Sequence, residues 1–313
     1  MKVSRKAFVH VGMPKTGTTA VQTALSQSRA QLATVGLIYP GQEIDHVLLV
    51  PEFHQAGSSH YYYNQRGELP EQYLPRVQAL LDDITGCAKE NCSDIIVSSE
   101  YLHNLNHSAL TCLDRFFADL ELEMVVVCVV RHPVDAATSG IQQSVKQGGD
   151  KLVELYKNPT WHSARETLKT SIDALGRRRV IAIDFGESQQ MGVERFLLQS
   201  IGYQKAVNII ETARINEGLS MAAVHLCDAH NELAKAQPLI MHERGYIFSI
   251  GGARFQLPAH VADKVRSESQ EEVTWLRENF GLVLREPQFS QAPYEDVISS
   301  AAAMDLVRLI LKL

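Results

Sequence analysis

The stretch AFVHVGMPKTGTT, residues 7–19, decides how the chain can fold. Its first five residues are mostly apolar and read as a short buried strand that ends at Gly12. Beyond the turn, apolar residues recur at helical spacing, at Val21, Leu25 and Leu32. The stretch therefore predicts a strand, a tight turn and an amphipathic helix, in that order.

The same alternation continues along the chain. Further strands are predicted over residues 94–98, 124–130 and 180–184, and helices over residues 71–88 and 110–120. The longest of these strands is apolar at every position, which is typical of a central parallel strand. The alternation predicts an α/β fold, with a P-loop-type parallel β-sheet flanked by helices. In such a sheet, ligands bind beyond the carboxyl ends of the strands.

The domain organisation follows from where this alternation stops. From about residue 193 the pattern is mainly helical. We predict a single domain over residues 1–313, with a core over about 3–202 and a helical C-terminal extension over about 203–313.

The turn GMPKTGTT, residues 12–19, has the features of a phosphate-binding loop. Successive backbone N–H groups can surround an anion there, and the helix N-terminus adds the positive end of its dipole. The two glycines let the backbone curl closely around phosphate oxygens. Thr18 and Thr19 add hydroxyl donors, and Lys15 adds a positive charge.

The loop departs from the GxxxxGK[ST] loop of nucleotide triphosphatases. In that loop the lysine directly follows the second glycine. Here Thr18 occupies that place, and Lys15 lies two residues before Gly17. The departure argues against ATP or GTP as the ligand.

Residues 9–19, VHVGMPKTGTT, resemble the 5′-phosphosulfate loop of sulfotransferases that use 3′-phosphoadenosine 5′-phosphosulfate (PAPS). The PKTGTT core is characteristic of that family, particularly of its carbohydrate-modifying and bacterial branches. The resemblance implies that Lys15 stabilises the bridging oxygen and the leaving group. It also implies a set of residues that bind the 5′-phosphosulfate: Pro14, Lys15, Thr16, Gly17, Thr18 and Thr19.

A second motif, VVRHPVDAATS, occupies residues 129–139. Arg131 leaves the tip of a predicted strand, and Ser139 lies about two helical turns further on. An arginine fork and a hydroxyl arranged in this way can hold a phosphate monoester by charge-assisted hydrogen bonds. The motif resembles the 3′-phosphate motif of the same family, in which proline follows the arginine two residues later and serine eight residues later, and Pro133 completes the match. An enzyme that recognises ATP would have no use for a separate monoester site.

The resemblance implies transfer of a sulfuryl group from PAPS to a hydroxyl or amine acceptor, such as a carbohydrate or small metabolite. A general base, usually His or Glu, must take the acceptor's proton. Glu100 follows a predicted strand at the carboxyl edge of the sheet and ranks first. His46, in an irregular region where similar bacterial chains often carry a histidine, ranks second. The weaker candidates are His54, His60 and His103.

Three further segments have two interpretations each. Residues 214–220, RINEGLS, resemble a segment found after the core in bacterial sulfotransferases, but they also read as a helix start capped by Asn216. The three tyrosines at 61–63 form either a wall for stacking a sugar or partly buried loop anchors. The three arginines at 177–179 read as a solvated helix end rather than a binding patch.

Composition excludes several classes of protein. The chain carries 30 Lys and Arg against 36 Asp and Glu, a net charge of −6, which argues against general nucleic-acid binding. No stretch approaches the roughly 18–20 apolar residues of a membrane span. The five cysteines show no CxxC spacing and accompany no metal-like histidine cluster. We expect reduced thiols, no metal and a cytoplasmic protein.

Two other classes of function remain open at this stage. One is a P-loop kinase of related fold, for which binding of ATP with Mg²⁺ would argue. The other is a non-catalytic nucleotide-binding protein, which would bind adenosine 3′,5′-bisphosphate without turnover. The C-terminal third is expected to shape either the acceptor pocket or the surface of a homodimer.

Overall fold

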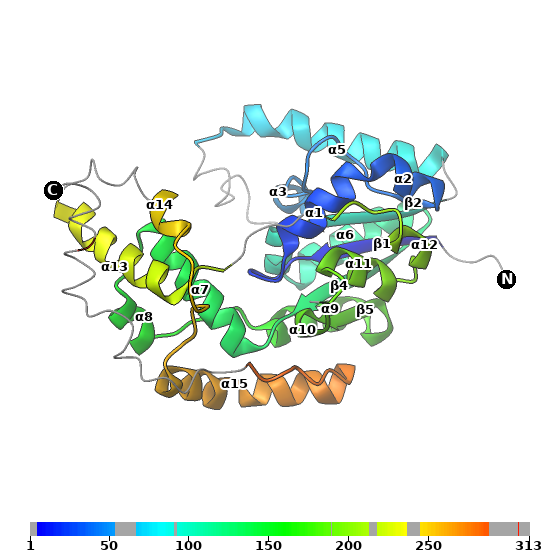
Figure 1. Ribbon diagram of the computed structural model, residues 1–313. Helices are drawn as coiled ribbons and strands as arrows, with labels where there is room; N and C mark the ends of the chain where they lie inside the picture. The colour runs from blue at the N-terminus through cyan, green and yellow to red at the C-terminus, as the bar shows by residue number, and fades with distance from the viewer. Residues whose placement is uncertain are drawn as a thin grey trace. The chain divides into compact units, whose positions relative to one another are not determined.

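The structure is a computed structural model that describes residues 5–53, 67–90, 93–188, 190–212, 218–236, 245–287 and 306 (Figure 1). The chain forms two compact units. The first unit comprises Met1–Arg131, Ser163–Ile215 and Trp275–Leu284, and the second comprises His132–His162, Asn216–Thr274 and Arg285–Leu313. A single domain with an extension from about residue 203 stays a prediction.

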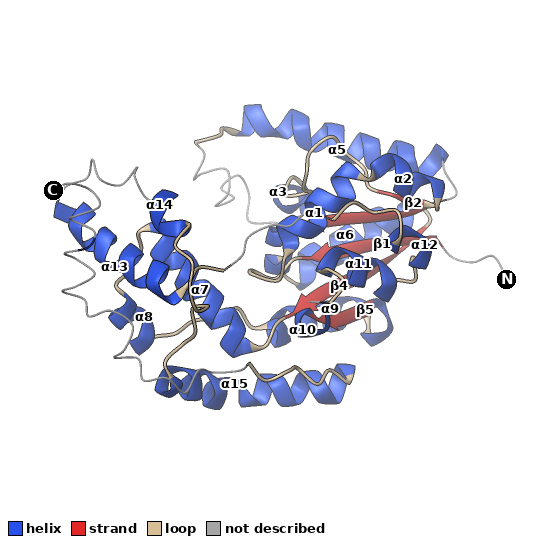
Figure 2. Ribbon diagram, in the orientation of Figure 1, coloured by secondary structure: helices blue, strands red, loops and turns tan. Residues whose placement is uncertain are grey.

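A parallel sheet forms the centre of the first unit (Figure 2). Within the described residues it has five strands in the order β2-β3-β1-β4-β5. The strands are β1 (Arg5–Val11), β2 (Leu37–Ile38), β3 (Asp94–Ser99), β4 (Leu122–Val130) and β5 (Val180–Asp184). The predicted parallel α/β sheet is confirmed, and all four predicted strands are present. Strand β2 was not predicted because two residues are too few to show a period.

Strand β1 lies in the middle of the sheet. Val11 at its end pairs with Ser99 of β3 on one side and with Cys128 of β4 on the other. Strand β4 is buried throughout from Met124 to Val130, because it lies between β1 and β5 and is covered on both faces. Since all strands are parallel, the residues that follow them gather at one edge. They are Gly12, Glu100, Arg131 and Phe185.

Helices cover both faces of this sheet (Figure 1). On one face, α1 (Thr18–Gln27), α11 (Val193–Ser200) and α12 (Gln204–Val207) bury an apolar cluster against strand residues such as Phe8 and Val127. On the other, α6 (His107–Asp119) packs against β4, and α9 (Ala164–Leu175) packs against α6, β4 and β5. The shorter or peripheral helices are α2 (Arg29–Thr34), α3 (Leu49–Phe53), α5 (Pro70–Glu90), η1 (Glu100–Asn104), η2 (Arg177–Arg179) and α10 (Phe185–Ser188).

The helix that follows the phosphate loop is shorter than its apolar period suggests. The spacing of Val21, Leu25 and Leu32 predicts one helix, but the structure has two, separated at Ser28. Ser28 is fully buried, and its hydroxyl accepts a hydrogen bond from the backbone N–H of Glu211 at 3.1 Å. The interruption at Ser28 is therefore accompanied by a tertiary contact that no local pattern reveals.

None of the three arginines of η2 is buried, but two of them contact other elements. The Nε of Arg177 donates to the carbonyl oxygen of Asn279 at 2.9 Å, and its guanidinium lies over the ring of Phe280, 3.9 Å from the centroid. Arg179 forms an ion pair with Asp114 at 2.7 Å. Arg177 and Arg179 thus join elements of the first unit, and the exposure of Arg177 and Arg178 agrees with the predicted solvated helix end.

The second unit is helical in the residues described, with one isolated bridge between Ser220 and Arg254. Its core contains Val134, Ile141 and Val265. Its helices are α7 (Pro133–Gln147), α8 (Leu152–Lys157), α13 (Met221–Ala236), α14 (Gly245–Phe248) and the greater part of α15 (Ala259–Phe280). Among the described parts of both units, none of the helices has the length and apolar character needed to cross a bilayer.

Candidate functional site

The predicted phosphate loop connects β1 to α1 at the carboxyl edge of the sheet. The backbone N–H of Gly12 donates to the carbonyl oxygen of Ser99 at 3.1 Å, so the loop begins level with the end of β3. Both Lys15 and Gly17 have left-handed backbones, with φ of 66° and 78°. The first N–H groups of α1 have no partner within the helix and supply donors for an anion.

The two glycines of the loop meet close steric limits. A Cβ at Gly12 would lie 2.4 Å from Cγ2 of Thr18, and one at Gly17 would lie 2.8 Å from Cγ1 of Val193. Gly17 also needs its positive φ to begin α1. The loop can therefore pass this close to α1 and α11 only with glycine at both positions.

Two of the loop threonines hold the loop itself. The Thr16 hydroxyl donates to the carbonyl oxygen of Met13 at 2.7 Å, and the Thr18 hydroxyl donates to the same oxygen at 3.4 Å. Both side chains are buried, with 2% and 4% exposed. Thr19 is exposed on the first turn of α1. The hydroxyls of Thr18 and Thr19 were both expected to face an anion. The Thr18 hydroxyl donates to Met13 instead, whereas Thr19 is exposed and keeps its predicted role as a prediction.

Arg131 reaches the phosphate loop. Its Nη1 donates to the backbone carbonyl oxygen of Lys15 at 2.8 Å, although the two residues are far apart in sequence. A left-handed conformation costs a non-glycine residue roughly 1–2 kcal/mol, and this hydrogen bond helps to hold Lys15 in it. Two motifs that were predicted separately are thus in direct contact within the first unit.

Ser139, the other half of the predicted 3′-phosphate motif, lies on α7 in the second unit. It is partly exposed and lies on the side of α7 away from the buried Ala137, Ile141 and Val145. Its pairing with Arg131 stays a prediction.

Glu100 is the first residue of η1, directly after β3. The turn is fixed by the Ser99 hydroxyl, which accepts a hydrogen bond from the N–H of Tyr101 at 3.3 Å. Because Ser99 also accepts from Gly12, Glu100 and the start of the phosphate loop follow neighbouring strands at the same level. The Glu100 side chain is half-buried. Its role as the general base stays a prediction.

His46 is held differently from what its predicted role requires. Its Nδ1 accepts from the N–H of Ser98 at 3.1 Å, so its Nε2 carries the proton and donates to the carbonyl oxygen of Pro40 at 3.0 Å. The ring is 1% exposed, and burial lowers the pKa of His46 to about 4. Because both ring nitrogens are hydrogen-bonded to backbone groups, the ring has no free lone pair that could take a proton from a substrate hydroxyl. The geometry favours Glu100 over His46.

A second buried histidine lies on β1 below the loop. His10 is fully buried, its Nδ1 is hydrogen-bonded to the Ser98 hydroxyl at 2.8 Å, and its Nε2 has no hydrogen-bond partner among the described residues. Burial lowers the pKa of His10 to about 4, because a protonated ring would hold an unsatisfied N–H in the core.

Because both histidines have lowered pKa values in the folded protein, we expect the protein to lose stability in mild acid. Both pKa values fall from 6.5 to about 4 on folding, so the unfolded chain binds more protons between those values. The free energy of unfolding should be constant with respect to these groups above pH 6.5. It should fall by on the order of 3 kcal/mol per histidine as the pH approaches 4. Chemical denaturation at pH 7.5, 6 and 4.5 measures this.

The control is His10→Asn, which retains a polar partner for Ser98 but cannot titrate. This variant should be less stable than the wild type at pH 7.5, yet lose less stability between pH 7.5 and 4.5. Parallel losses in the two proteins over that range would contradict the role of His10.

The remaining candidates separate into two groups. His103 lies in η1, and its Nδ1 is hydrogen-bonded to the backbone carbonyl of Glu100. His54, His60, the tyrosines at 61–63 and residues 213–217 lie outside the described residues. Phe185 was not among the predicted site residues, but its ring lies beneath the guanidinium of Arg131, 5.0 Å from the centroid. Its position directly after a predicted strand was the available signal.

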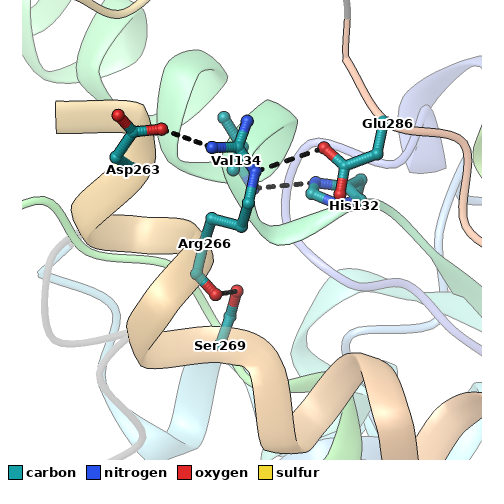
Figure 3. A network of polar contacts seen from close by, with 6 residues as sticks. All are labelled: His132, Val134, Asp263, Arg266, Ser269 and Glu286. Carbon is teal, nitrogen blue, oxygen red and sulfur yellow. Dashed lines mark hydrogen bonds and ion pairs between the residues drawn. The ribbon is translucent and has the colours of Figure 1, made fainter. Parts of the chain in front are cut away.

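The second unit begins with a polar network around His132 (Figure 3). His132 is the N-cap of α7, and its Nδ1 accepts from the N–H of Val134 at 3.3 Å. Its Nε2 lies 3.5 Å from Glu286, which also contacts Nε of Arg266 at 3.4 Å, and Arg266 pairs with Asp263 on α15. Burial lowers the pKa of His132, and Glu286 opposes that shift. This cap fixes where α7 starts.

Across the residues that the structure describes, three or more His, Cys, Asp or Glu side chains are nowhere grouped as a metal site would require.

Comparison with known proteins identifies the architecture. No family model matches the sequence, and no curated protein is similar to it. Among solved structures, the crystal structure of a sulfotransferase from Alicyclobacillus acidocaldarius is similar over 90% of this chain and 98% of its own, with a TM-score of 0.51 and 14% sequence identity. The chain has the sulfotransferase fold.

The predicted resemblance to sulfotransferases is thus confirmed at the level of the fold. A sulfotransferase domain from the curacin biosynthetic pathway is also similar, over 86% of this chain and 99% of its own, with a TM-score of 0.39 and 13% identity. That likeness is too distant to add to the first. In the sulfotransferase fold of this chain, the phosphate loop, Glu100 and Arg131 lie at one edge of the sheet.

Proposed function

We propose that this chain is a sulfotransferase that transfers the sulfuryl group of PAPS to a hydroxyl acceptor, such as a carbohydrate or a small metabolite. An amine is the less favoured acceptor. PAPS is a co-substrate, and its product is adenosine 3′,5′-bisphosphate. The observation that carries this proposal is the 2.8 Å hydrogen bond from Arg131 to the carbonyl of Lys15, because it joins the two predicted phosphate motifs.

The loop would bind the 5′-phosphosulfate. Its anion donors are the free N–H groups at the start of α1, the exposed hydroxyl of Thr19 and the charge of Lys15. Pro14, Thr16, Gly17 and Thr18 set the path of the backbone around the ligand. A charged group aimed at the leaving oxygen is most valuable where negative charge develops, and we assign this role to Lys15.

Glu100 would act as the general base. The acceptor hydroxyl gives its proton to the Glu100 carboxylate while its oxygen forms a bond to sulfur. The bond between sulfur and the bridging oxygen breaks, and its electron pair stays on the leaving phosphate. Positioning and electrostatic stabilisation account for most of the rate of such a transfer.

Arg131 and Ser139 would bind the 3′-phosphate. A phosphate monoester carries roughly two negative charges near neutral pH and matches the fork of a guanidinium. The spacing of the two residues in the sequence supports this assignment for both. The contact of Arg131 with the loop supports it for Arg131.

The test is a comparison of nucleotides by isothermal calorimetry. Adenosine 3′,5′-bisphosphate should bind roughly one to two decades more tightly than adenosine 5′-phosphate, because the latter leaves Arg131 without its charge-assisted partner. Arg131→Ala should remove most of that difference. Arg178→Ala, at an exposed position of η2, is the matched control.

Equal binding of the two nucleotides by the wild-type protein would refute the assignment. Tighter binding of ATP with Mg²⁺ than of adenosine 3′,5′-bisphosphate would favour the kinase alternative. Binding of adenosine 3′,5′-bisphosphate without transfer from PAPS to any acceptor in a broad panel would favour the non-catalytic alternative.

A metal requirement separates the same alternatives independently. The positive charge in this site comes from Lys15, Arg131 and backbone N–H groups, so we expect transfer to be unchanged by EDTA. The measurement is turnover of PAPS before and after chelation and after addition of Mg²⁺. Activity lost to the chelator and restored by Mg²⁺ would count against the proposal.

A further inference from the structure

Phe185 lies next to Arg131 because their strands are neighbours. Val130 at the end of β4 pairs with Asp184 at the end of β5, and Arg131 and Phe185 are the residues that follow. The turn at Phe185 is held on both sides: the N–H of Gly186 donates to Oδ1 of Asp184 at 2.8 Å, and the Ser188 hydroxyl donates to the carbonyl of Phe185 at 2.6 Å. These two hydrogen bonds therefore fix the backbone from which the Phe185 ring extends.

The Phe185 ring contacts both phosphate motifs. The Arg131 guanidinium lies over it, 5.0 Å from the centroid, which is the geometry of a cation–π contact. A Cβ built at Gly17 would lie 3.3 Å from Cε2 of the same ring, so the ring also lies directly against the phosphate loop. The ring packs in turn on the apolar cluster beneath α1 and α11.

We infer that Phe185 is a positioning residue for the nucleotide site: its ring holds the Arg131 guanidinium in the orientation that meets the 3′-phosphate. This inference rests on the proposed function. A long arginine side chain loses rotamer freedom when it binds a ligand, and a ring that holds it beforehand reduces that loss. The Arg131 contact with Lys15 completes the arrangement, since the guanidinium is held by the ring and by the loop carbonyl together.

The ring acts through Arg131, so its removal should affect one nucleotide and spare the other. Phe185→Leu keeps an apolar side chain against Gly17 but removes the aromatic face. We expect it to weaken binding of adenosine 3′,5′-bisphosphate by roughly 3- to 30-fold. Binding of adenosine 5′-phosphate should change less than twofold. Phe185→Tyr keeps the aromatic face and should restore wild-type binding of both.

A double-mutant cycle tests whether the Phe185 ring acts through Arg131. In the Arg131→Ala background, Phe185→Leu should cause no further loss of adenosine 3′,5′-bisphosphate binding, because the side chain that the ring positions is absent. Melting temperatures are measured for every variant. Phe185→Met, which fills similar space without a ring face, replaces the leucine variant if that protein does not fold.

The outcomes are distinct. Selective loss with Phe185→Leu, rescue by tyrosine and no additional loss with Arg131→Ala support the inference. Equal losses for both nucleotides would mean that the ring supports the loop or contacts the nucleoside directly, and would overturn it. Additive losses in the cycle would overturn it as well. If the wild-type protein does not distinguish the two nucleotides, the proposed function fails and this inference falls with it.

Discussion

Lys15→Ala will lower kcat by about 10²–10³-fold, the usual loss for one donor that stabilises charge in the transition state. The side chain belongs to a loop that already offers several backbone N–H groups, so binding of adenosine 3′,5′-bisphosphate should fall much less than kcat. An interaction made mainly in the transition state lowers kcat and kcat/KM together. Steady-state turnover of PAPS measures kcat, and calorimetry measures binding of adenosine 3′,5′-bisphosphate.

The alanine variant keeps the left-handed backbone at position 15, so the carbonyl that Arg131 contacts stays available. Lys89→Ala, at an exposed position near the end of α5, is the matched control and should have wild-type kinetics. A Lys15→Ala protein with unchanged kcat and weakened product binding would show that Lys15 only binds the nucleotide.

Glu100→Gln will lower turnover by about 10²–10⁴-fold, the range for loss of a general base. The amide keeps the size and polarity of the side chain at the start of η1 but cannot take a proton. Steady-state turnover of PAPS by the wild-type protein and by the variant measures this loss. Binding of adenosine 3′,5′-bisphosphate should be unchanged, because Glu100 does not belong to either phosphate motif.

Glu90→Gln, at the exposed end of α5, controls for loss of a carboxylate. The competing assignment is tested with His46→Asn, chosen because an alanine would leave Ser98 and Pro40 without their buried partners. Turnover that survives in Glu100→Gln but is lost in a folded His46→Asn would make His46 the base.

The strands and the glycine-containing turn after β1 could be predicted because each leaves a local signature; that the turn binds a phosphate stays a prediction. An apolar run such as 124–130 indicates burial on both faces, and glycines between a strand and a helix indicate a loop that binds an anion. Parallel pairing then places Gly12, Glu100 and Arg131 at one edge, so their neighbourhood also follows from the sequence.

What could not be predicted depends on contacts between distant residues. The Thr18 hydroxyl was expected to face an anion, but it donates to Met13. A histidine in a loop offers no sign that both of its nitrogens will be taken by backbone groups, as those of His46 are. Likewise Phe185 reads as an ordinary apolar residue until β4 and β5 pair and place it under Arg131.

The central place of β1 has a consequence for biosynthesis. Strand β1 pairs with β3 and β4, which follow much later in the sequence, so the native sheet depends on contacts of long range in sequence. The loop after β1 depends on the same late contact, because the N–H of Gly12 donates to the carbonyl oxygen of Ser99 at the end of β3. During synthesis β1 therefore has to wait for β3 before it can pair. While it is unpaired, its apolar residues are exposed, and such a segment is prone to aggregation.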